Sequence, residues 1–153
     1  MTLKENPMHV LVLQGPNLNR LGKRDPRFYG THPLTEVTSR IDTRAGELDV
    51  KVDHVQANCE GRLIDWLQER QDGADAIICN PAGLTNYGLS LRDALSDTGL
   101  DLAIVHLSNP LGREPWRRED VFAEIADLYL AGAGWHGYVM ALDGLHARAA
   151  DRT

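Results

Sequence analysis

The sequence contains little cysteine and no long apolar run. Its two cysteines, Cys59 and Cys79, are too few for a disulfide framework, and Cys79 lies inside an apolar strand pattern. This usage predicts a reducing compartment. No apolar run approaches the length of a transmembrane helix, and residues 1–7 lack the apolar core of a signal peptide. We therefore expect a cytoplasmic protein with no membrane partner.

The sequence also lacks the excess of basic residues that is typical of nucleic-acid-binding proteins. Its 153 residues carry a formal net charge of -6, and 25% of them are charged. The densest basic stretch, residues 113–118, is interrupted by Glu114 and Pro115. This stretch is either a solvated loop or a clamp for an anion or a hydroxyl group. A nucleic-acid partner is not expected.

Several catalytic motifs are missing as well. There is no Walker lysine motif, no G-x-S-x-G elbow and no pair of Cys or His residues at metal-ligand spacing. These absences weigh against a metal site. We likewise expect no dinucleotide site of the G-x-G-x-x-G kind.

What the sequence does contain is an alternation of strand and helix patterns, which predicts an α/β fold with a parallel sheet covered by helices on both faces. The predicted strands are residues 8 to the Gly15-Pro16 pair, 51–56, 76–79, 102–107 and 128–131. The predicted helices are residues 35–48 with Thr35 as the cap, 59–71, one that ends near Gly99, and 134–148. One domain over residues 1–153 is expected, with flexible ends at 1–7 and 149–153.

Polar loops follow three of these strands, at residues 14–19, 80–87 and 106–117. The carboxyl ends of parallel strands meet at one edge of a sheet, so these loops are expected to converge on one crevice. The first loop and the residues that follow it up to Gly30 combine the amide of Asn17, the guanidinium of Arg24 and the phenol of Tyr29. A guanidinium near a phenol makes it more acidic, which would suit proton transfer. The alternative is a solvated, mobile loop in which these residues only form turns.

A single histidine, His106, ends the fourth strand. A lone histidine at such a position is more often structural than catalytic. Here Ser108 and Asn109 follow it directly, and the neighbouring strands end in Gly- and Asn-rich loops. That context favours a catalytic histidine.

Three segments carry a resemblance to a known family. GPNLNRLGKRDPRFYG, NPAGLTNYGLSLRDAL and VHLSNPLGREPWRRED occur in the order and spacing of the type II 3-dehydroquinate dehydratases, and the resemblance covers residues 10–145. It implies a flavodoxin-like five-stranded sheet, no cofactor and a homo-oligomer of four trimers, a dodecamer. It also implies a step of the shikimate pathway, the route to aromatic amino acids. That step is an anti elimination of water from a small carboxylate, 3-dehydroquinate, through an enolate to 3-dehydroshikimate.

The resemblance implies roles for individual residues. Tyr29 matches the base that removes a proton beside the ketone, and Arg24 the arginine that makes this tyrosine more acidic. Asn17 matches the amide at the enolate oxygen, and His106 the acid that protonates the departing hydroxyl. The implied substrate contacts are Asn80 and the backbone amides of Leu107 and Ser108 for the carboxylate, Arg117 for a ring hydroxyl, and Asp93 at the site of a neighbouring subunit.

The sequence departs from the family pattern near the histidine. The family usually carries a glutamate two residues before it, where this chain has Ile104. His106 would then lack its carboxylate partner and be oriented by a backbone carbonyl or another side chain. Asn86 replaces a histidine that contacts a ring hydroxyl, and Leu84 replaces a tyrosine.

These departures leave two alternatives to dehydration of 3-dehydroquinate. The chain could act on an analogue, such as amino-dehydroquinate, in which one ring hydroxyl is replaced. It could also be a non-catalytic, dehydroquinase-like protein that binds a small carboxylate. The joint presence of the proton-transfer residues weighs against the second alternative.

Overall fold

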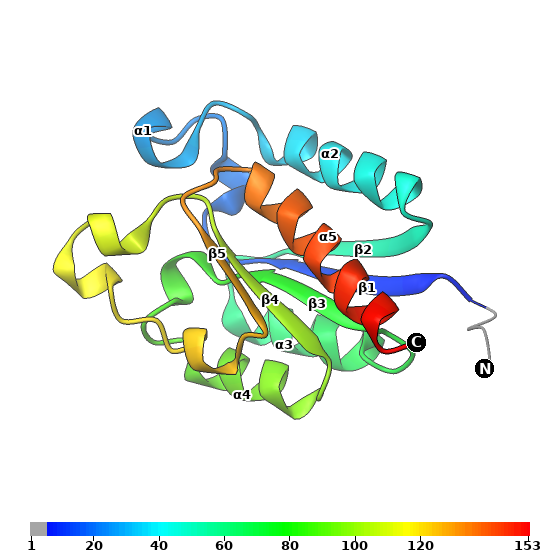
Figure 1. Cartoon of the computed structure of the whole chain (residues 1–153). Helices are drawn as coiled ribbons and strands as arrows, with labels where there is room; N and C mark the ends of the chain where they lie inside the picture. The colour runs from blue at the N-terminus through cyan, green and yellow to red at the C-terminus, as the bar shows by residue number, and fades with distance from the viewer. Residues whose placement is uncertain (1–5) are drawn as a thin grey trace.

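A five-stranded parallel sheet forms the centre of the computed structural model, which describes residues 6–153 (Figure 1). Its spatial order is β2-β1-β3-β4-β5. The strands are β1 (Met8–Gln14), β2 (Val50–Gln56), β3 (Ala76–Asn80), β4 (Asp101–His106) and β5 (Leu128–Ala131). The predicted fold class is confirmed, since every neighbouring pair is parallel.

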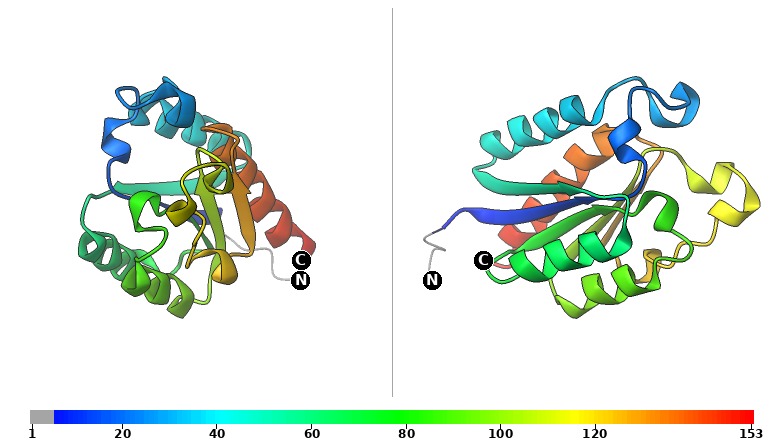
Figure 2. Two further views of the ribbon diagram at one scale, coloured as in Figure 1. Left: turned by 90° about the vertical axis from the view of Figure 1, so that its left-hand side faces the viewer. Right: turned by 180° about the vertical axis from the view of Figure 1, so that it is seen from behind.

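Helices cover both faces of the sheet, as the alternating pattern predicts. They are α1 (Pro26–Tyr29), α2 (Leu34–Glu47), α3 (Glu60–Arg70), α4 (Leu89–Asp97) and α5 (His136–Asp151). Helices α2 and α5 lie on one face, and α3 and α4 lie on the other (Figure 2). No helix within residues 6–153 is both long and apolar enough to cross a bilayer.

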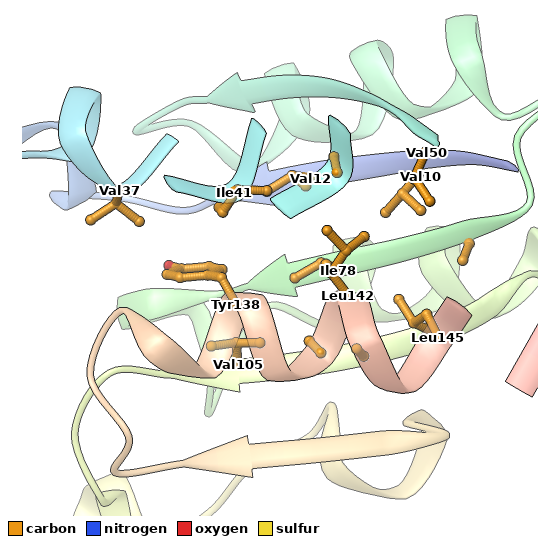
Figure 3. Packing of buried hydrophobic residues seen from close by; sticks show 14 of the residues in the cluster. Val10, Val12, Val37, Ile41, Val50, Ile78, Val105, Tyr138, Leu142 and Leu145 are labelled. Carbon is orange, nitrogen blue, oxygen red and sulfur yellow. The ribbon is translucent and has the colours of Figure 1, made fainter. Parts of the chain in front are cut away.

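Strand β1 shows why the apolar runs are continuous. Successive side chains point to opposite faces of a sheet, and here both faces are covered, so both sets are buried. Val10 and Val12 pack with Ile41 of α2 and Leu142 of α5 (Figure 3). Leu11 and Leu13 pack on the other side, in the cluster that α3 and α4 complete.

The element ends differ in places from the prediction. Helix α2 begins at Leu34 after Pro33, and no side chain caps it, so Thr35 is not its cap. Residues 149–151, which we expected to fray, belong to α5. Arg148 and Arg152 pair with Asp101 at the start of β4 and hold this last turn against the sheet. Of the amino-terminal segment expected to be flexible, residues 1–5 lie outside the described residues.

Candidate active site

The carboxyl ends of the strands lie on the left in Figure 1. At that edge of the sheet, the loops that follow β1, β3 and β4 enclose a cavity of about 290 Å³. Gly15 brings the first two loops together, because a Cβ there would lie 2.5 Å from the carbonyl oxygen of Pro81. The cavity lining includes nine of the ten residues predicted from the sequence: Asn17, Arg24, Tyr29, Asn80, Asn86, His106, Leu107, Ser108 and Arg117. The expected convergence of the polar loops is therefore present in the structure.

Asp93 is the predicted residue that does not reach this cavity. Its side chain is 72% exposed on α4, and its carboxylate lies 3.3 Å from the guanidinium of the adjacent Arg92. Its role at the site of a neighbouring subunit stays a prediction.

Asn17 holds a backbone conformation that few residue types adopt. Its φ and ψ of 68° and -3° lie in the left-handed region, which asparagine tolerates better than most residues with a Cβ. Its N–H donates to the side-chain oxygen of Asn58 at 2.9 Å. The sharp turn after β1 therefore places the Asn17 amide in the cavity lining rather than continuing the strand.

Tyr29 lies between two arginines. The Arg24 guanidinium lies over the ring, with its Cζ 3.7 Å from the centroid, and Arg113 Nη1 donates to the phenolic oxygen at 2.9 Å. Arg113 Nη1 also donates to Ser108 Oγ at 3.2 Å. The Arg113 side chain is only 7% exposed, and its Nε lies 3.6 Å from the carboxylate of Glu114. Two cations therefore lie against the phenol, Arg24 over its ring and Arg113 at the oxygen on which negative charge would develop.

Arg113 is the charged residue of the cavity lining to which the sequence assigns no separate role. It belongs to the basic stretch considered as an anion clamp, but the predicted roles went to Arg24 and Arg117. Arg117 itself pairs with Glu114 at 2.8 Å and stacks on Trp116, whereas Arg113 reaches the phenol. The available signal was its place within the VHLSNPLGREPWRRED segment, seven positions after His106.

His106 has a carboxylate partner, which corrects the prediction from Ile104. Its Nε2 lies 2.7 Å from Oδ2 of Asp120, and both side chains are 7% exposed. Tyr129 donates its hydroxyl to the same oxygen at 2.7 Å. Burial alone would raise the pKa of Asp120, but the hydrogen bonds from His106 and Tyr129 outweigh it and hold that pKa below its ordinary value. Asp120 is therefore an anion beside the imidazole.

A buried hydrogen-bonded chain supports Asn80 beneath the cavity. Asn80 donates to the hydroxyl of Tyr138 at 2.8 Å, and that hydroxyl donates to Gln14 at 2.6 Å. Burial raises the pKa of Tyr138, so the phenol stays protonated and remains a donor. The Asn80 side-chain oxygen accepts from Ala82 N–H at 3.0 Å. The bonds to Tyr138 and Ala82 hold the amide of Asn80 in one orientation, and Gln14 holds the Tyr138 hydroxyl.

The departures from the family pattern fall in two places. Asn86 lines the cavity, and its Nδ2 donates to the carbonyl oxygen of Trp116 at 3.3 Å. Leu84 and Ile104 are buried in the core on the side of α3 and α4 instead. Of these three, therefore, only Asn86 is placed to contact a ligand.

A glycine pattern that we did not expect follows β5. Gly132, Gly134 and Gly137 have the G-x-G-x-x-G spacing of the dinucleotide site that we did not expect. Gly132 N–H lies 3.2 Å from the carbonyl oxygen of His106, and Gly134 N–H donates to Leu107 at 3.0 Å. These amides are already paired within the protein and do not form a phosphate cradle.

This glycine brace, Gly132 to Gly134, also orients the loop after β4. In a trans peptide the carbonyl oxygen and the following N–H point in opposite directions. Because the oxygens of His106 and Leu107 face Gly132 and Gly134, the N–H groups of Leu107 and Ser108 point away from the brace. Both residues line the cavity.

No group of three or more His, Cys, Asp or Glu residues within 6–153 could hold a metal ion.

Comparison with known proteins agrees with these features. The family model described as dehydroquinase class II matches residues 8–146. A 3-dehydroquinate dehydratase of Roseiflexus castenholzii is 47% identical over 90% of this chain and 88% of its own length. A 3-dehydroquinate dehydratase of Pelotomaculum thermopropionicum is 43% identical over 93% of this chain and 99% of its own length. The crystal structure of the type II dehydroquinase from Propionibacterium acnes superposes with a TM-score of 0.88 at 33% identity, covering 93% of this chain and 98% of the other.

Proposed function

The chain belongs to the class II dehydroquinase family, and we propose on that basis that it is a hydro-lyase that converts 3-dehydroquinate to 3-dehydroshikimate. The observation that carries the proposal is that Tyr29, with its two arginines, and His106, with its carboxylate, line the same cavity. A base and an acid are the two groups that an elimination of water needs. We also propose that residues 1–153 form one domain acting in the cytoplasm.

In the first step Tyr29, as the phenolate, takes the proton from the carbon beside the ketone. The electrons of that C–H bond form the enolate, with the negative charge on the former ketone oxygen. The guanidinium groups of Arg24 and Arg113 favour the phenolate before transfer because both lie against Tyr29. The Asn17 amide donates to the enolate oxygen, a contact that strengthens as charge develops there.

In the second step the enolate collapses to the conjugated enone and expels the hydroxyl group on the opposite face. His106 gives this hydroxyl its proton, so that the product released is water. The Asp120 carboxylate stabilises the imidazolium that must be present before the transfer. The two protons moved in the reaction thus pass through Tyr29 and His106.

The remaining lining residues are proposed to orient the substrate. Asn80 and the N–H groups of Leu107 and Ser108 would bind its carboxylate, since the glycine brace points these amides away from itself. Asn86, from the loop after β3, and Arg117, from the loop after β4, would contact ring hydroxyls. Asn86, the altered residue that lines the cavity, would thus contact the part of the ring away from the proton transfers.

An ultraviolet assay tests the function, because the conjugated enone product absorbs where the substrate does not. We expect absorbance to rise when purified protein is mixed with 3-dehydroquinate, and to rise more slowly with an analogue that carries an amino group in place of a ring hydroxyl. Faster turnover of the analogue would contradict the proposed substrate. No turnover of either compound would contradict the activity.

Asn86 gives a prediction about substrate preference. Its Oδ1 remains for a ring hydroxyl because its Nδ2 is paired with Trp116. One neutral hydrogen bond contributes about 0.5–1.5 kcal/mol, which is roughly a twofold to tenfold effect on kcat/KM. Asn86→His should therefore change the kcat/KM ratio between 3-dehydroquinate and an analogue altered at that hydroxyl. An unchanged ratio, measured for both compounds in one buffer, would show that Asn86 does not contact the ring.

We further propose a trimer-based oligomer, four trimers forming a dodecamer. Leu89 is the first residue of α4, and Tyr87 lies two residues before it, both close in sequence to Asp93. Both are large exposed hydrophobic side chains that such an interface would cover. Light scattering at micromolar concentration should give a mass that is a multiple of three chains of 17.0 kDa. A monomeric mass would contradict this proposal, and an isolated trimer would contradict the dodecamer alone.

A further inference from the structure

Both carboxylate oxygens of Asp120, the partner of the candidate acid His106, contact neighbouring groups. Oδ2 lies 2.7 Å from His106 Nε2 and also accepts from the hydroxyl of Tyr129 at 2.7 Å. Oδ1 accepts from Phe122 N–H at 2.9 Å. The carboxylate is therefore fully engaged, and the imidazole is tied through Nε2, which leaves Nδ1 as its second nitrogen.

We propose that Asp120, fixed in place by Tyr129, is the positioning residue that orients the His106 imidazole and keeps it protonated for the elimination. This inference rests on the proposed function and deepens it. Asp120 and Tyr129 are absent from the cavity lining, so they act on the substrate only through His106. With Nε2 held by a carboxylate, Nδ1 is the nitrogen that serves the substrate.

The geometry of the sheet explains why the carboxylate comes from a loop. Ile104 lies two residues before His106 on β4, so both side chains point to the same face. Ile104 is completely buried in the apolar cluster beneath α3 and α4. On β5, Tyr129 is the register partner of Ile104, and its ring centroid lies 5.5 Å from that of His106. The Tyr129 phenol, beside the apolar Ile104, thus extends to the carboxylate of Asp120.

The loop that carries Asp120 is anchored on both sides, which a positioning group requires. Phe122 is completely buried. Val121 N–H donates to the carbonyl oxygen of Thr85 at 3.0 Å, and Arg92 Nε donates to the carbonyl of Val121 at 2.9 Å. Asp120 therefore does not depend on the substrate for its position.

The charges around the imidazole act in opposite directions. Asp120 favours the protonated ring, whereas cations across the cavity oppose it. Burial and Asp120 raise the pKa of Tyr129, so Tyr129 remains a neutral donor. Burial likewise raises the pKa of Cys79, and Asp120 adds to the shift. The titratable and charged groups facing this region are Asp120, Tyr129 and Cys79 on one side and Tyr29, Arg24, Arg113 and Arg117 on the other.

Asp120→Asn tests the proposal with little change of shape, since the amide oxygen can still accept from Phe122. We expect kcat to fall by about 10–100-fold while KM changes less than about threefold. The alkaline limb of the kcat profile should move to lower pH by about one unit, because the imidazole loses its neighbouring anion. Tyr129→Phe should lower kcat only severalfold and should not move this limb to lower pH, since Asp120 keeps its charge.

Glu119→Gln is the matched control. It removes the same charge from the adjacent, exposed position of the same loop, so it should leave both kcat and the pH profile unchanged. Equal shifts in Glu119→Gln and Asp120→Asn would overturn the proposal by showing a general effect of net charge. Normal kcat and pH profile in Asp120→Asn would also overturn it.

Nitrogen NMR of the His106 ring gives a readout that does not require turnover. In the wild-type protein we expect a carboxylate-bonded Nε2, and in Asp120→Asn a ring titration displaced to lower pH. An identical titration in the two proteins would overturn the positioning role even if activity fell. A different result is that the wild-type protein shows no turnover of 3-dehydroquinate while the Asp120→Asn titration is still displaced from that of the wild type. That result would support the positioning role and refute the proposed function.

Discussion

Replacing Tyr29 by phenylalanine is expected to lower kcat by about 10²–10⁴-fold, the range that a general base contributes. Only the phenolic oxygen is removed, and the ring still packs under Arg24. The lost oxygen acts in the transition state more than in the bound substrate, so KM should change little. Steady-state kinetics with 3-dehydroquinate, together with equilibrium binding of the product, would separate these two quantities.

Tyr87→Phe is a suitable control for Tyr29→Phe. It removes a hydroxyl from another tyrosine near the edge of the site, but Tyr87 is exposed and is not part of the cavity lining. Its kcat should equal that of the wild type. A Tyr29→Phe variant with comparable activity would mean that another group, or a bound water, removes the proton.

His106→Asn should lower kcat by a similar factor, about 10²–10⁴-fold, for a different reason. Hydroxide is a poor leaving group, and asparagine cannot supply a proton to it at neutral pH. The enolate should still form, because Tyr29 and its arginines are untouched. In deuterated water His106→Asn should therefore still exchange the substrate hydrogen beside the ketone, whereas Tyr29→Phe should not.

His54→Asn is the control for the histidine. His54 also contacts a carboxylate, Asp42 at 2.6 Å, but it lies on β2 at the outer edge of the sheet. Its replacement should affect neither dehydration nor hydrogen exchange. Loss of exchange in His106→Asn would place the histidine in the first step and contradict the division of roles between the two residues.

The strands and most site residues could be predicted because the signals are local. An apolar run that stops at Gly15-Pro16 identifies β1 from neighbouring residues alone, and parallel pairing then places the following loops at one edge. The GPNLNRLGKRDPRFYG segment adds Asn17 and Tyr29 in the same way. The helix ends were less predictable, since Arg152 holds the last turn of α5 through a residue 51 positions away.

The partners of the reacting groups could not be predicted, because they depend on the paths of loops. Arg113 reaches Tyr29 across 84 positions, and no periodic pattern encodes that contact. Asp120 lies 14 positions after His106, and its approach depends on how the buried Phe122 anchors the far end of the loop that carries Asp120. Ile104 leaves β4 without a carboxylate beside the histidine, as the sequence shows. The prediction that His106 lacks a carboxylate partner is wrong, because Asp120 supplies one.

The glycine brace also determines how the molecule opens locally. The amides of Gly132 and Gly134 can exchange with solvent only when they separate from residues 106–108. Any fluctuation that frees the glycine brace, which lies just before α5, therefore breaks its bonds to the loop after His106 as well, so the two segments form one cooperative opening unit. Ligand bound in the cavity should accordingly slow hydrogen exchange at these two glycines, which do not line it.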